Sequence, residues 1–319
     1  MCSSSLSGLH LACESIARGE SELAIAGGVN LNLHENKYFQ LSQNRFLASD
    51  GRCRSFGAGG DGYVPGEGVG AVLLKPLADA VRDGDRIQGV ILGSAINHGG
   101  KTKGYTVPSP SSQAEVIRAA LAAANVRPQD VSYIEAHGTG TALGDPIEIE
   151  GLARALRTDA ETEARGAIAI GSVKSNIGHL EGAAGVAALS KVLLQFRHGQ
   201  LVASLHSEPE NPNIDFANSL FNVQKTLSGW QERARKPGVP YGRISGISSF
   251  GAGGSNAHVI VADYLHKSPR EIHPDSRIPG GKNIFLLSAK DHQGLLRFSE
   301  NLFRALSRDV AQFDLDDIC

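Results

Sequence analysis

Residues 132–148 read SYIEAHGTGTALGDPIE, and this stretch indicates the class of the fold. Its first part, residues 132–136, is a short run that predicts a strand. Further on, Asp145 followed by Pro146, with Glu148 two residues later, is typical of a helix start with Asp145 as the cap. A strand, a glycine-rich loop and a helix in succession predict one unit of an α/β fold.

The rest of the chain repeats this alternation of strands and helices, which predicts sheets covered by helices. Residues 23–29, LAIAGGV, are expected to form a buried strand, and residues 49–68 a glycine-rich loop. A linker is expected at 267–282, before a strand-like run at 283–288 and an amphipathic segment at 293–306. Further helices are expected at residues 5–18, 39–47, 77–82, 112–125 and 182–196, and further strands at residues 69–74, 87–96, 167–173, 244–250 and 257–261.

The composition narrows the class of protein. The 319 residues include 31 Lys and Arg against 33 Asp and Glu, a balance that argues against a polybasic nucleic-acid binder. The 41% hydrophobic content allows a large buried core, and no apolar run reaches the roughly 18 residues that a membrane helix needs. The four cysteines form no CxxC motif, which favours a reducing compartment and predicts a cytoplasmic protein: Cys2, Cys13, Cys53 and Cys319.

Cys2 stands before a predicted helix of small and apolar residues, with Ser3, Ser4 and Ser5 between. The positive end of a helix dipole is expected to lower the pKa of this thiol and to favour the thiolate. The neighbouring hydroxyls are expected to cap the helix. On position alone, the alternative is a small core residue without chemistry.

Two histidines follow predicted strands in matching settings. His137 ends the strand at 132–136, and His179 follows the strand at 167–173 through the sequence Lys174-Ser175-Asn176-Ile177-Gly178. Loops at the carboxyl ends of strands are where α/β folds place their ligands. The two settings therefore indicate two equivalent units that face one site. Each residue also has a plainer interpretation, a loop histidine held by its neighbours or, for the lysine of this segment, a surface charge.

Glycine-rich segments give two further signals. Residues 249–258, SFGAGGSNAH, predict a turn between strands whose backbone N–H groups approach a ligand closely, or a tight hairpin without chemistry. Residues 57–62 match GxGxxG, but no clear strand precedes them and Pro65 follows where a helix should begin, so we discount dinucleotide binding. The other histidines show no metal-type spacing, so a structural zinc is not expected; among them are His10, His34, His98, His206 and His258.

Together these motifs resemble the β-ketoacyl synthases of polyketide and fatty-acid synthases. The resemblance runs from residue 2 to about 263, and the tail from Asn283 resembles the start of the segment that follows a ketosynthase in modular synthases. Met1 before the cysteine and residues 97–108, NHGGKTKGYTVP, resemble modular polyketide synthases whose acyltransferase is a separate protein. The motifs that carry the resemblance are residues 2–5, 135–141, 144–148, 174–179 and 249–258.

The resemblance implies a thiolase-like, layered αβαβα fold. Members of the family carry a long segment before the cysteine, so we expect a fragment cut at both ends, with most of the first half-domain missing. The missing strands would leave a sheet edge and apolar helix faces uncovered, so we expect poor solubility or inactivity for this chain alone. The expected parts are the rest of the N-terminal ketosynthase half at 1–105, the C-terminal half at 106–264, and a linker with the start of the next segment at 265–319.

The resemblance also implies a reaction, the decarboxylative Claisen condensation of a Cys2-bound acyl chain with malonyl on an acyl carrier protein. It assigns catalysis to Cys2, His137 and His179, with an oxyanion hole formed by the backbone N–H groups of Cys2 and Ala252. Many relatives carry a bulky Phe where this chain has Ala252, so a roomier acyl pocket is expected. It assigns a supporting polar network to Lys174, Glu148 and Asn176, and a pocket gate to Phe250, Gly251 and Ala252.

No cofactor or metal is expected to bind directly, because the substrates travel on the phosphopantetheine of the carrier protein. The implied partners are that carrier protein, other synthase domains and, in the full-length parent, a second copy of the chain, with no nucleic acid and no membrane. Two alternatives stay open. One is a thiolase-like acyltransferase on coenzyme A, which commonly uses a second cysteine near the 249–258 turn that is absent here. The other is a non-condensing or scaffold fragment of a megasynthase.

Overall fold

The computed structural model describes residues 2–102, 104, 107–157, 165–232, 242–265 and 287–308. The chain divides into two compact units, Met1–Leu265 and His266–Cys319. In the second unit, helix α8 spans His292–Arg308 and contains the amphipathic segment expected at 293–306. The expected linker and most of the strand-like run after it lie outside the described residues.

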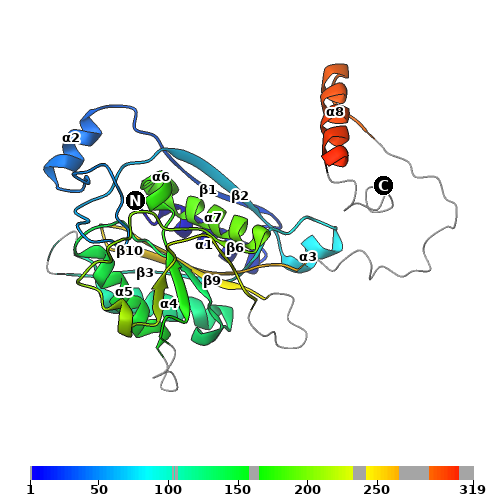
Figure 1. The fold of residues 1–319 in the computed structure, drawn as a ribbon. Helices are drawn as coiled ribbons and strands as arrows, with labels where there is room; N and C mark the ends of the chain where they lie inside the picture. Colours follow the sequence, from blue (N-terminus) through cyan, green and yellow to red (C-terminus); the bar gives the residue numbers. More distant parts are fainter. Residues whose placement is uncertain are drawn as a thin grey trace. The chain divides into compact units, whose positions relative to one another are not determined.

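The first unit is built around a six-stranded sheet in the order β3-β10-β9-β4-β5-β7 (Figure 1). Strands β9, β4, β5 and β7 run parallel to their neighbours in that order, whereas β10 is antiparallel to both β3 and β9. Their bounds are β3 Val90–His98, β4 Tyr133–Glu135, β5 Ile168–Gly171, β7 Phe221–Val223, β9 Ile244–Phe250 and β10 Ser255–Ala262.

Helices cover both faces of this sheet. On one face, α4 (Pro110–Ala124) packs on β3 and β10 and also on α5 (Gly144–Leu156). On the other face, α1 (Ser4–Ala17) contacts β10 and α7 (Ala184–His198) contacts β9. An antiparallel ribbon of β1 (Ala24–Asn30) and β2 (Gly68–Leu74) packs on α1 and α7 in turn, so helical and sheet layers alternate. The remaining elements are α2 Asn36–Gln43, α3 Leu77–Arg82, α6 Lys174–Ile177, β6 Gln200–Leu201 and β8 Ser228–Gly229.

The sheet separates two hydrophobic cores, because successive side chains of a strand point to opposite faces. On β10, Val259 belongs to the core shared with α1 and α7, and Ile260 belongs to the core under α4 and α5. Ile117 of α4 and Leu152 of α5 are fully buried in the second core. Because helices pack on both faces of the sheet, the positions of its strand ends are fixed, and the site lies at these ends.

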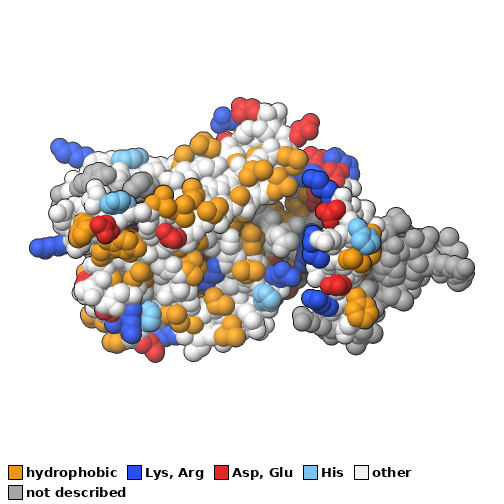
Figure 2. All heavy atoms as spheres, turned by 90° about the horizontal axis from the view of Figure 1, so that it is seen from above, with side chains coloured by type: hydrophobic (Ala, Val, Ile, Leu, Met, Phe, Trp, Pro, Cys, Tyr) orange, Lys and Arg blue, Asp and Glu red, His pale blue; other side chains and the backbone are white. Residues whose placement is uncertain are grey.

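The ribbon corrects one expectation. Strand β1 is present, but the prediction that it is buried is wrong, because it pairs only with β2 and packs through one face. Ile25 is 77% exposed and Val69, on the neighbouring strand, is 76% exposed. An apolar run therefore predicted the strand but not the layers around it. On the face of the molecule that Figure 2 shows, hydrophobic side chains gather in patches between charged ones.

Candidate active site

The site lies where three neighbouring parallel strands end. Strands β5, β4 and β9 are adjacent and parallel, so their carboxyl ends meet at one edge of the sheet. His137 follows β4, the segment Lys174–His179 follows β5, and the turn at residues 251–254 follows β9. The topology thus brings three separate stretches of sequence to one place, as open α/β sheets do for their ligands.

Cys2 is held at the same edge by the β9–β10 hairpin. The hydroxyl of Ser249 donates to the carbonyl oxygen of Cys2 at 3.0 Å. The hydroxyl of Ser3 donates to that of Ser255, also at 3.0 Å. The prediction that the serine hydroxyls cap α1 is wrong for Ser3, which is the N-cap residue but makes no side-chain cap, because its hydroxyl serves the hairpin.

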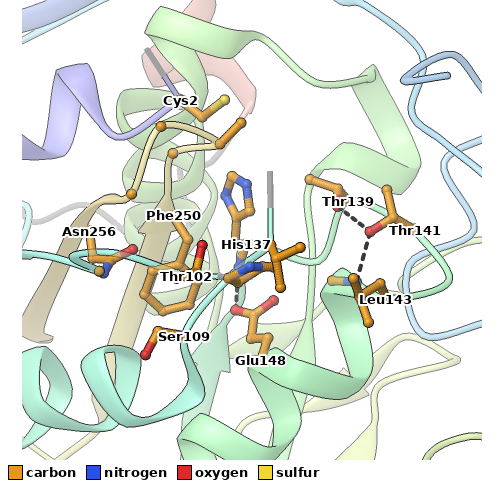
Figure 3. A pocket seen from close by; sticks show the side chains of 18 of the residues that line it. Cys2, Thr102, Ser109, His137, Thr139, Thr141, Leu143, Glu148, Phe250 and Asn256 are labelled. Carbon is orange, nitrogen blue, oxygen red and sulfur yellow. Dashed lines mark hydrogen bonds between the residues drawn. The ribbon is translucent and has the colours of Figure 1, made fainter. Parts of the chain in front are cut away.

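The structure brings Cys2, His137 and His179 together. One sulfur or nitrogen atom from each lies within 4.8 Å of the others. The two imidazole rings meet edge to face, with centroids 5.3 Å apart. All three residues line one cavity of about 690 Å³, and Figure 3 shows Cys2 and His137 on its wall. The geometry allows a single ligand to contact the sulfur and both rings.

The thiol of Cys2 has a higher pKa than its position before helix α1 suggested. Burial raises the pKa of Cys2 above its ordinary value, and this outweighs the opposing effects of the Lys174 charge and of the backbone N–H of Ala252. The expectation of a lowered pKa is therefore wrong. It considered the helix end alone, whereas the desolvation comes from segments that are distant in the sequence.

Both histidines are neutral. Burial holds the pKa of His137 and of His179 well below the usual range, and the positive charge of Lys174 adds to this. The backbone N–H of Glu181 donates to Nδ1 of His179 at 3.0 Å. In a neutral imidazole, a ring nitrogen that accepts leaves the proton on the other nitrogen. Nε2 of His179 is therefore a donor, and it is buried with no partner among the described residues.

Glu148 fixes the loop that carries His137. Its two carboxylate oxygens accept from the backbone N–H groups of His137 at 2.7 Å and of Gly138 at 2.8 Å. Burial raises the pKa of Glu148 to about 7. The carboxylate thus lies beside His137, as a supporting residue would, but it grips the backbone and leaves the ring free.

Asp145 has a different partner from the one expected. Helix α5 begins at Gly144 with Leu143 at the N-cap and no side-chain cap, so the prediction of Asp145 as the cap is wrong. Its carboxylate accepts from the backbone N–H of Phe56 at 2.7 Å and from that of Gly140 at 3.1 Å. The residue therefore ties the loop after β4 to the glycine-rich loop.

That glycine-rich loop supports His179. The backbone N–H of His179 donates to the carbonyl of Val64 at 2.7 Å, and the N–H of Gly66 donates to the carbonyl of His179 at 2.9 Å. The ring of Tyr63 packs edge-on against the imidazole, with centroids 4.8 Å apart. A Cβ on Gly66 would lie 2.6 Å from the carbonyl oxygen of Ile177. This supporting role was not predicted from the sequence, although the density of glycines at residues 49–68 was a signal for it.

A buried ion pair beneath the site was also missed. Lys191 donates to Oε2 of Glu135 at 2.7 Å, and Oε1 of Glu135 accepts from the backbone N–H of Val173 at 2.6 Å. Lys174 is 2% exposed, so the surface interpretation of this lysine is wrong. Burial lowers the pKa of Lys174, and the charge of Glu135 opposes the shift. The sequence signal for the Lys191–Glu135 pair was Lys191, a lone lysine among the small and apolar residues of the helix expected at 182–196.

The remaining predicted residues divide into two groups. Phe250, Gly251 and Ala252 line the cavity, and the Phe250 ring lies 6.0 Å from that of His137. Asn176 is exposed and lies outside the cavity lining, with its amide nitrogen 3.5 Å from the carbonyl of Ala203. The structure therefore does not bring Asn176 to the site. Within the described part of the chain, every helix is too short or too polar to cross a bilayer.

The chain matches three family models along its length. Residues 1–80 match the N-terminal domain of β-ketoacyl synthases, residues 88–208 match their C-terminal domain, and residues 210–317 match the ketoacyl-synthetase C-terminal extension. The matches thus span both units of the chain.

Individual relatives agree with these models. Polyketide synthase PksL of Bacillus subtilis is 55% identical over 96% of this chain, which spans 7% of that protein. Polyketide synthase ThaG of Burkholderia thailandensis is 59% identical over 92% of this chain, which spans 5% of that protein.

Solved ketosynthases share the architecture. The oxazolomycin ketosynthase domain OzmH KS7 of Streptomyces albus is 49% identical, with a TM-score of 0.83 over 96% of this chain and 50% of that one. The ketosynthase from module 6 of the bacillaene synthase of Bacillus subtilis is 39% identical, with a TM-score of 0.85 over 99% of this chain and 53% of that one. The chain therefore belongs to the β-ketoacyl synthase family and has the thiolase-like α/β fold of its ketosynthases.

Proposed function

We propose that this chain carries the condensing site of a polyketide ketosynthase, which extends a Cys2-bound acyl chain with malonyl from an acyl carrier protein. The observation that carries the proposal is the convergence of the Cys2, His137 and His179 donor atoms within 4.8 Å in one cavity. A nucleophile beside two neutral hydrogen-bond donors is what such a reaction requires.

The first step loads Cys2. Its sulfur attacks the acyl thioester of a phosphopantetheine, the new carbon–sulfur bond forms as the old one breaks, and the thiol proton passes to the released pantetheine thiolate. The raised pKa of Cys2 means that the resting thiol keeps its proton until a substrate arrives. The charge of Lys174 and the N–H of Ala252 stabilise the thiolate when it forms.

The second step makes the carbon nucleophile. Malonyl on the carrier protein loses carbon dioxide, and the electron pair of the broken bond forms an enolate. Nε2–H of His179 is suited to donate to the enolate oxygen, because Nδ1 is already occupied as an acceptor. His137 supplies the second donor from the other side, and a neutral ring is the state in which one nitrogen carries a proton.

The third step joins the two chains. The enolate carbon attacks the Cys2 thioester, a tetrahedral oxyanion forms, and its collapse expels the Cys2 thiolate. Backbone N–H groups of Cys2 and Ala252 are proposed to hold this oxyanion, and the Ala252 amide already contacts the sulfur. In other enzymes the loss of one such donor costs about 3–4 kcal/mol of transition-state stabilisation.

Lys174 and Glu148 support these steps without touching the reacting atoms. Burial keeps both histidines neutral and the charge of Lys174 adds to this effect, while Glu148 holds the backbone of His137. We propose an acyl carrier protein and other synthase domains as partners, with the homodimer as the state of the full-length parent. The sequence around residues 97–108 supports the subtype with a separate acyltransferase.

The alternative functions differ in the cysteine thiols that they require at the site. Among the described residues that line the cavity, Cys2 is the sole cysteine, so the second thiol commonly used by a thiolase-like coenzyme A enzyme is absent there. Cys13 and Cys53 lie outside the lining of the cavity that contains Cys2 and the two histidines, so neither thiol is placed beside the histidine donors.

Acylation of the chain tests the proposal. The chain is incubated with an acyl-pantetheine thioester, and the adduct is located by peptide mass spectrometry. Because the three site residues converge within the described chain, we expect one acyl group on Cys2, in place of the inactivity expected from the sequence, and none on Cys13 or Cys53, with the Cys2→Ser variant as the control. An unmodified Cys2 would favour the scaffold alternative. The Cys–His–His set also has the donor types of a zinc site, so retention of one zinc per purified chain would contradict the proposal.

A further inference from the structure

Gln113 is a buried amide in the wall of the cavity that contains Cys2. It lies in the first turn of α4, is 2% exposed and lines the cavity. Its backbone N–H donates to the carbonyl of Ser109 at 3.0 Å. Its side-chain Oε1, in contrast, is buried and has no hydrogen-bond partner among the described residues. A buried amide oxygen without a donor costs free energy, and in a ligand cavity it marks a place where a ligand group can supply the bond.

A glycine on the neighbouring helix makes room for this amide. A Cβ on Gly151 of α5 would lie 3.0 Å from both Cβ and Oε1 of Gln113, so a side chain there would crowd the glutamine. Gly151 comes three residues after Glu148, on the same face of α5, and Glu148 lines the cavity. In the view of Figure 3, Glu148 and Ser109 lie beyond Phe250 as seen from Cys2.

The other polar groups on this side of the cavity have partners. Thr102 donates its hydroxyl to the carbonyl of Gly104 at 2.6 Å, and the Ser109 hydroxyl accepts from the backbone N–H of Ser112 at 3.3 Å. The carboxylate of Glu148 is occupied by backbone N–H groups. Gln113 therefore differs from Thr102, Ser109 and Glu148 in having an unoccupied hydrogen-bonding atom, which in this cavity it shares with the rings of His137 and His179.

The apolar residues that line the cavity indicate the class of ligand. Val107, Pro108 and Phe250 offer hydrocarbon and aromatic surface. Apolar surface and the buried amide of Gln113 in one cavity suit a hydrocarbon chain with one oxygen substituent. A hydroxyl can donate to Oε1 and accept from Nε2, so it fits the amide in either orientation, whereas a methylene leaves the amide unpaired.

We propose that Gln113 is a specificity-determining residue, which hydrogen-bonds a hydroxyl group on the acyl chain carried by Cys2. The inference rests on the proposed function, which supplies that acyl chain. It adds a preference: the chain accepts hydroxylated acyl groups over the corresponding unsubstituted ones, because only a hydroxyl satisfies the amide.

Matched probes test this preference on the 319-residue chain. The probes are N-acetylcysteamine thioesters of octanoate, unsubstituted or with one hydroxyl at carbon 3, 5 or 7. Each transfers its acyl group to the Cys2 sulfur, and the thiol proton passes to the sulfur of the released N-acetylcysteamine. Intact-mass measurement of the acylation rate should show about a tenfold advantage for one hydroxylated probe over octanoyl. The Gln113→Leu variant preserves size and should lose that advantage, so that its hydroxylated and octanoyl probes load at equal rates.

Thermal stability separates this role from a structural one. Gln113→Leu replaces an unpaired buried amide by an apolar side chain of similar size, so the Tm of the free chain should rise. The matched control is Gln195→Leu. Gln195 is equally buried and its Nε2 has no partner among the described residues, but its Oε1 accepts from the backbone N–H of Val202 at 3.0 Å, so this variant removes that bond and should lower the Tm.

Each outcome decides the inference. Equal rates for all probes on the wild-type chain, or a hydroxyl advantage that survives in Gln113→Leu, would overturn it while leaving the proposed function intact. A lower Tm for Gln113→Leu would reveal a structural partner and overturn it as well. If no probe acylates Cys2, the proposed function and this inference both fail.

Discussion

The two histidine loops are fixed in different ways. The loop of His137 is held by a side chain, because the Glu148 carboxylate accepts from two of its backbone N–H groups. The backbone of His179 itself is held by two backbone groups, the carbonyl of Val64 and the N–H of Gly66. The first arrangement contains a titratable group, and the second requires a glycine. Substitutions at the His137 loop and at the His179 segment should therefore affect stability and activity in different ways.

The largest effect is expected at the backbone-held segment. In Gly66→Ala, the new Cβ would lie 2.6 Å from the carbonyl oxygen of Ile177 and 2.7 Å from Cδ1 of Leu180. We expect the free energy of unfolding to fall by about 3 kcal/mol, and condensation to be lost. Chemical denaturation measures the first and product formation the second. The control is Gly8→Ala on α1, where nothing lies within 4 Å and a slight gain in stability is expected.

The side-chain-held loop should respond to removal of its carboxylate. In Glu148→Gln, the amide NH₂ faces one backbone N–H that the carboxylate accepted, so one buried donor loses its partner. We expect the unfolding free energy to fall by about 1–3 kcal/mol. Condensation should fall more than acylation of Cys2, because the ring of His137 shifts. Glu150→Gln, on the exposed face of the same helix, should change neither rate, and equal losses of both reactions in Glu148→Gln would contradict this role.

Only the His137 loop should show a stability change linked to Glu148. Burial raises the pKa of Glu148 from 4.5 to about 7, so the folded state binds this proton more tightly than the unfolded state. Stability from this group is therefore present below about pH 4.5 and is lost as the pH rises to 7, by about 3 kcal/mol. Asp145, with a pKa raised to about 6, adds to the same slope. Denaturation of Glu148→Gln across this range should give a flatter profile, and an unchanged profile would exclude Glu148 as its source.

The smallest effect is expected at the turn at residues 251–254, which belongs to neither histidine loop. Ala252→Phe keeps the backbone N–H beside the Cys2 sulfur but adds a ring to the cavity lining. We expect branched or long acyl groups to load more slowly, by about tenfold, with acetyl unaffected. Parallel acylation assays with acetyl and branched acyl thioesters measure the ratio. An unchanged ratio would remove Ala252 from the determinants of pocket size.

Local signals in the sequence predicted most elements and the positions of the key residues. His137 and His179 were identified because each follows a strand, and the parallel order β5-β4-β9 brings those strand ends together. The predictions that were wrong concern properties that depend on distant parts of the chain. The exposure of β1 depends on which layers cover it, and the raised pKa of Cys2 depends on burial by other segments.

Ion pairs and hydrogen bonds between residues far apart in the sequence could not be predicted either. Lys191 and Glu135 form an ion pair across 56 positions, and Asp145 reaches Phe56 across 89. No periodicity encodes such pairs, because they form only when helices and loops from separate stretches pack together. The glycine-rich loop shows the same limit: its glycines were visible, but their purpose required the carbonyls that they approach.

The most direct test of the account is the ratio of condensation to Cys2 acylation in His137→Ala. The ring of His137 is proposed to serve the enolate and not the loading of Cys2. We therefore expect condensation with malonyl-carrier protein to be abolished and acylation to remain near the wild-type rate, with His198→Ala, an exposed histidine on α7, unchanged in both. Loss of acylation to the same degree as condensation would contradict the division of labour proposed for this site.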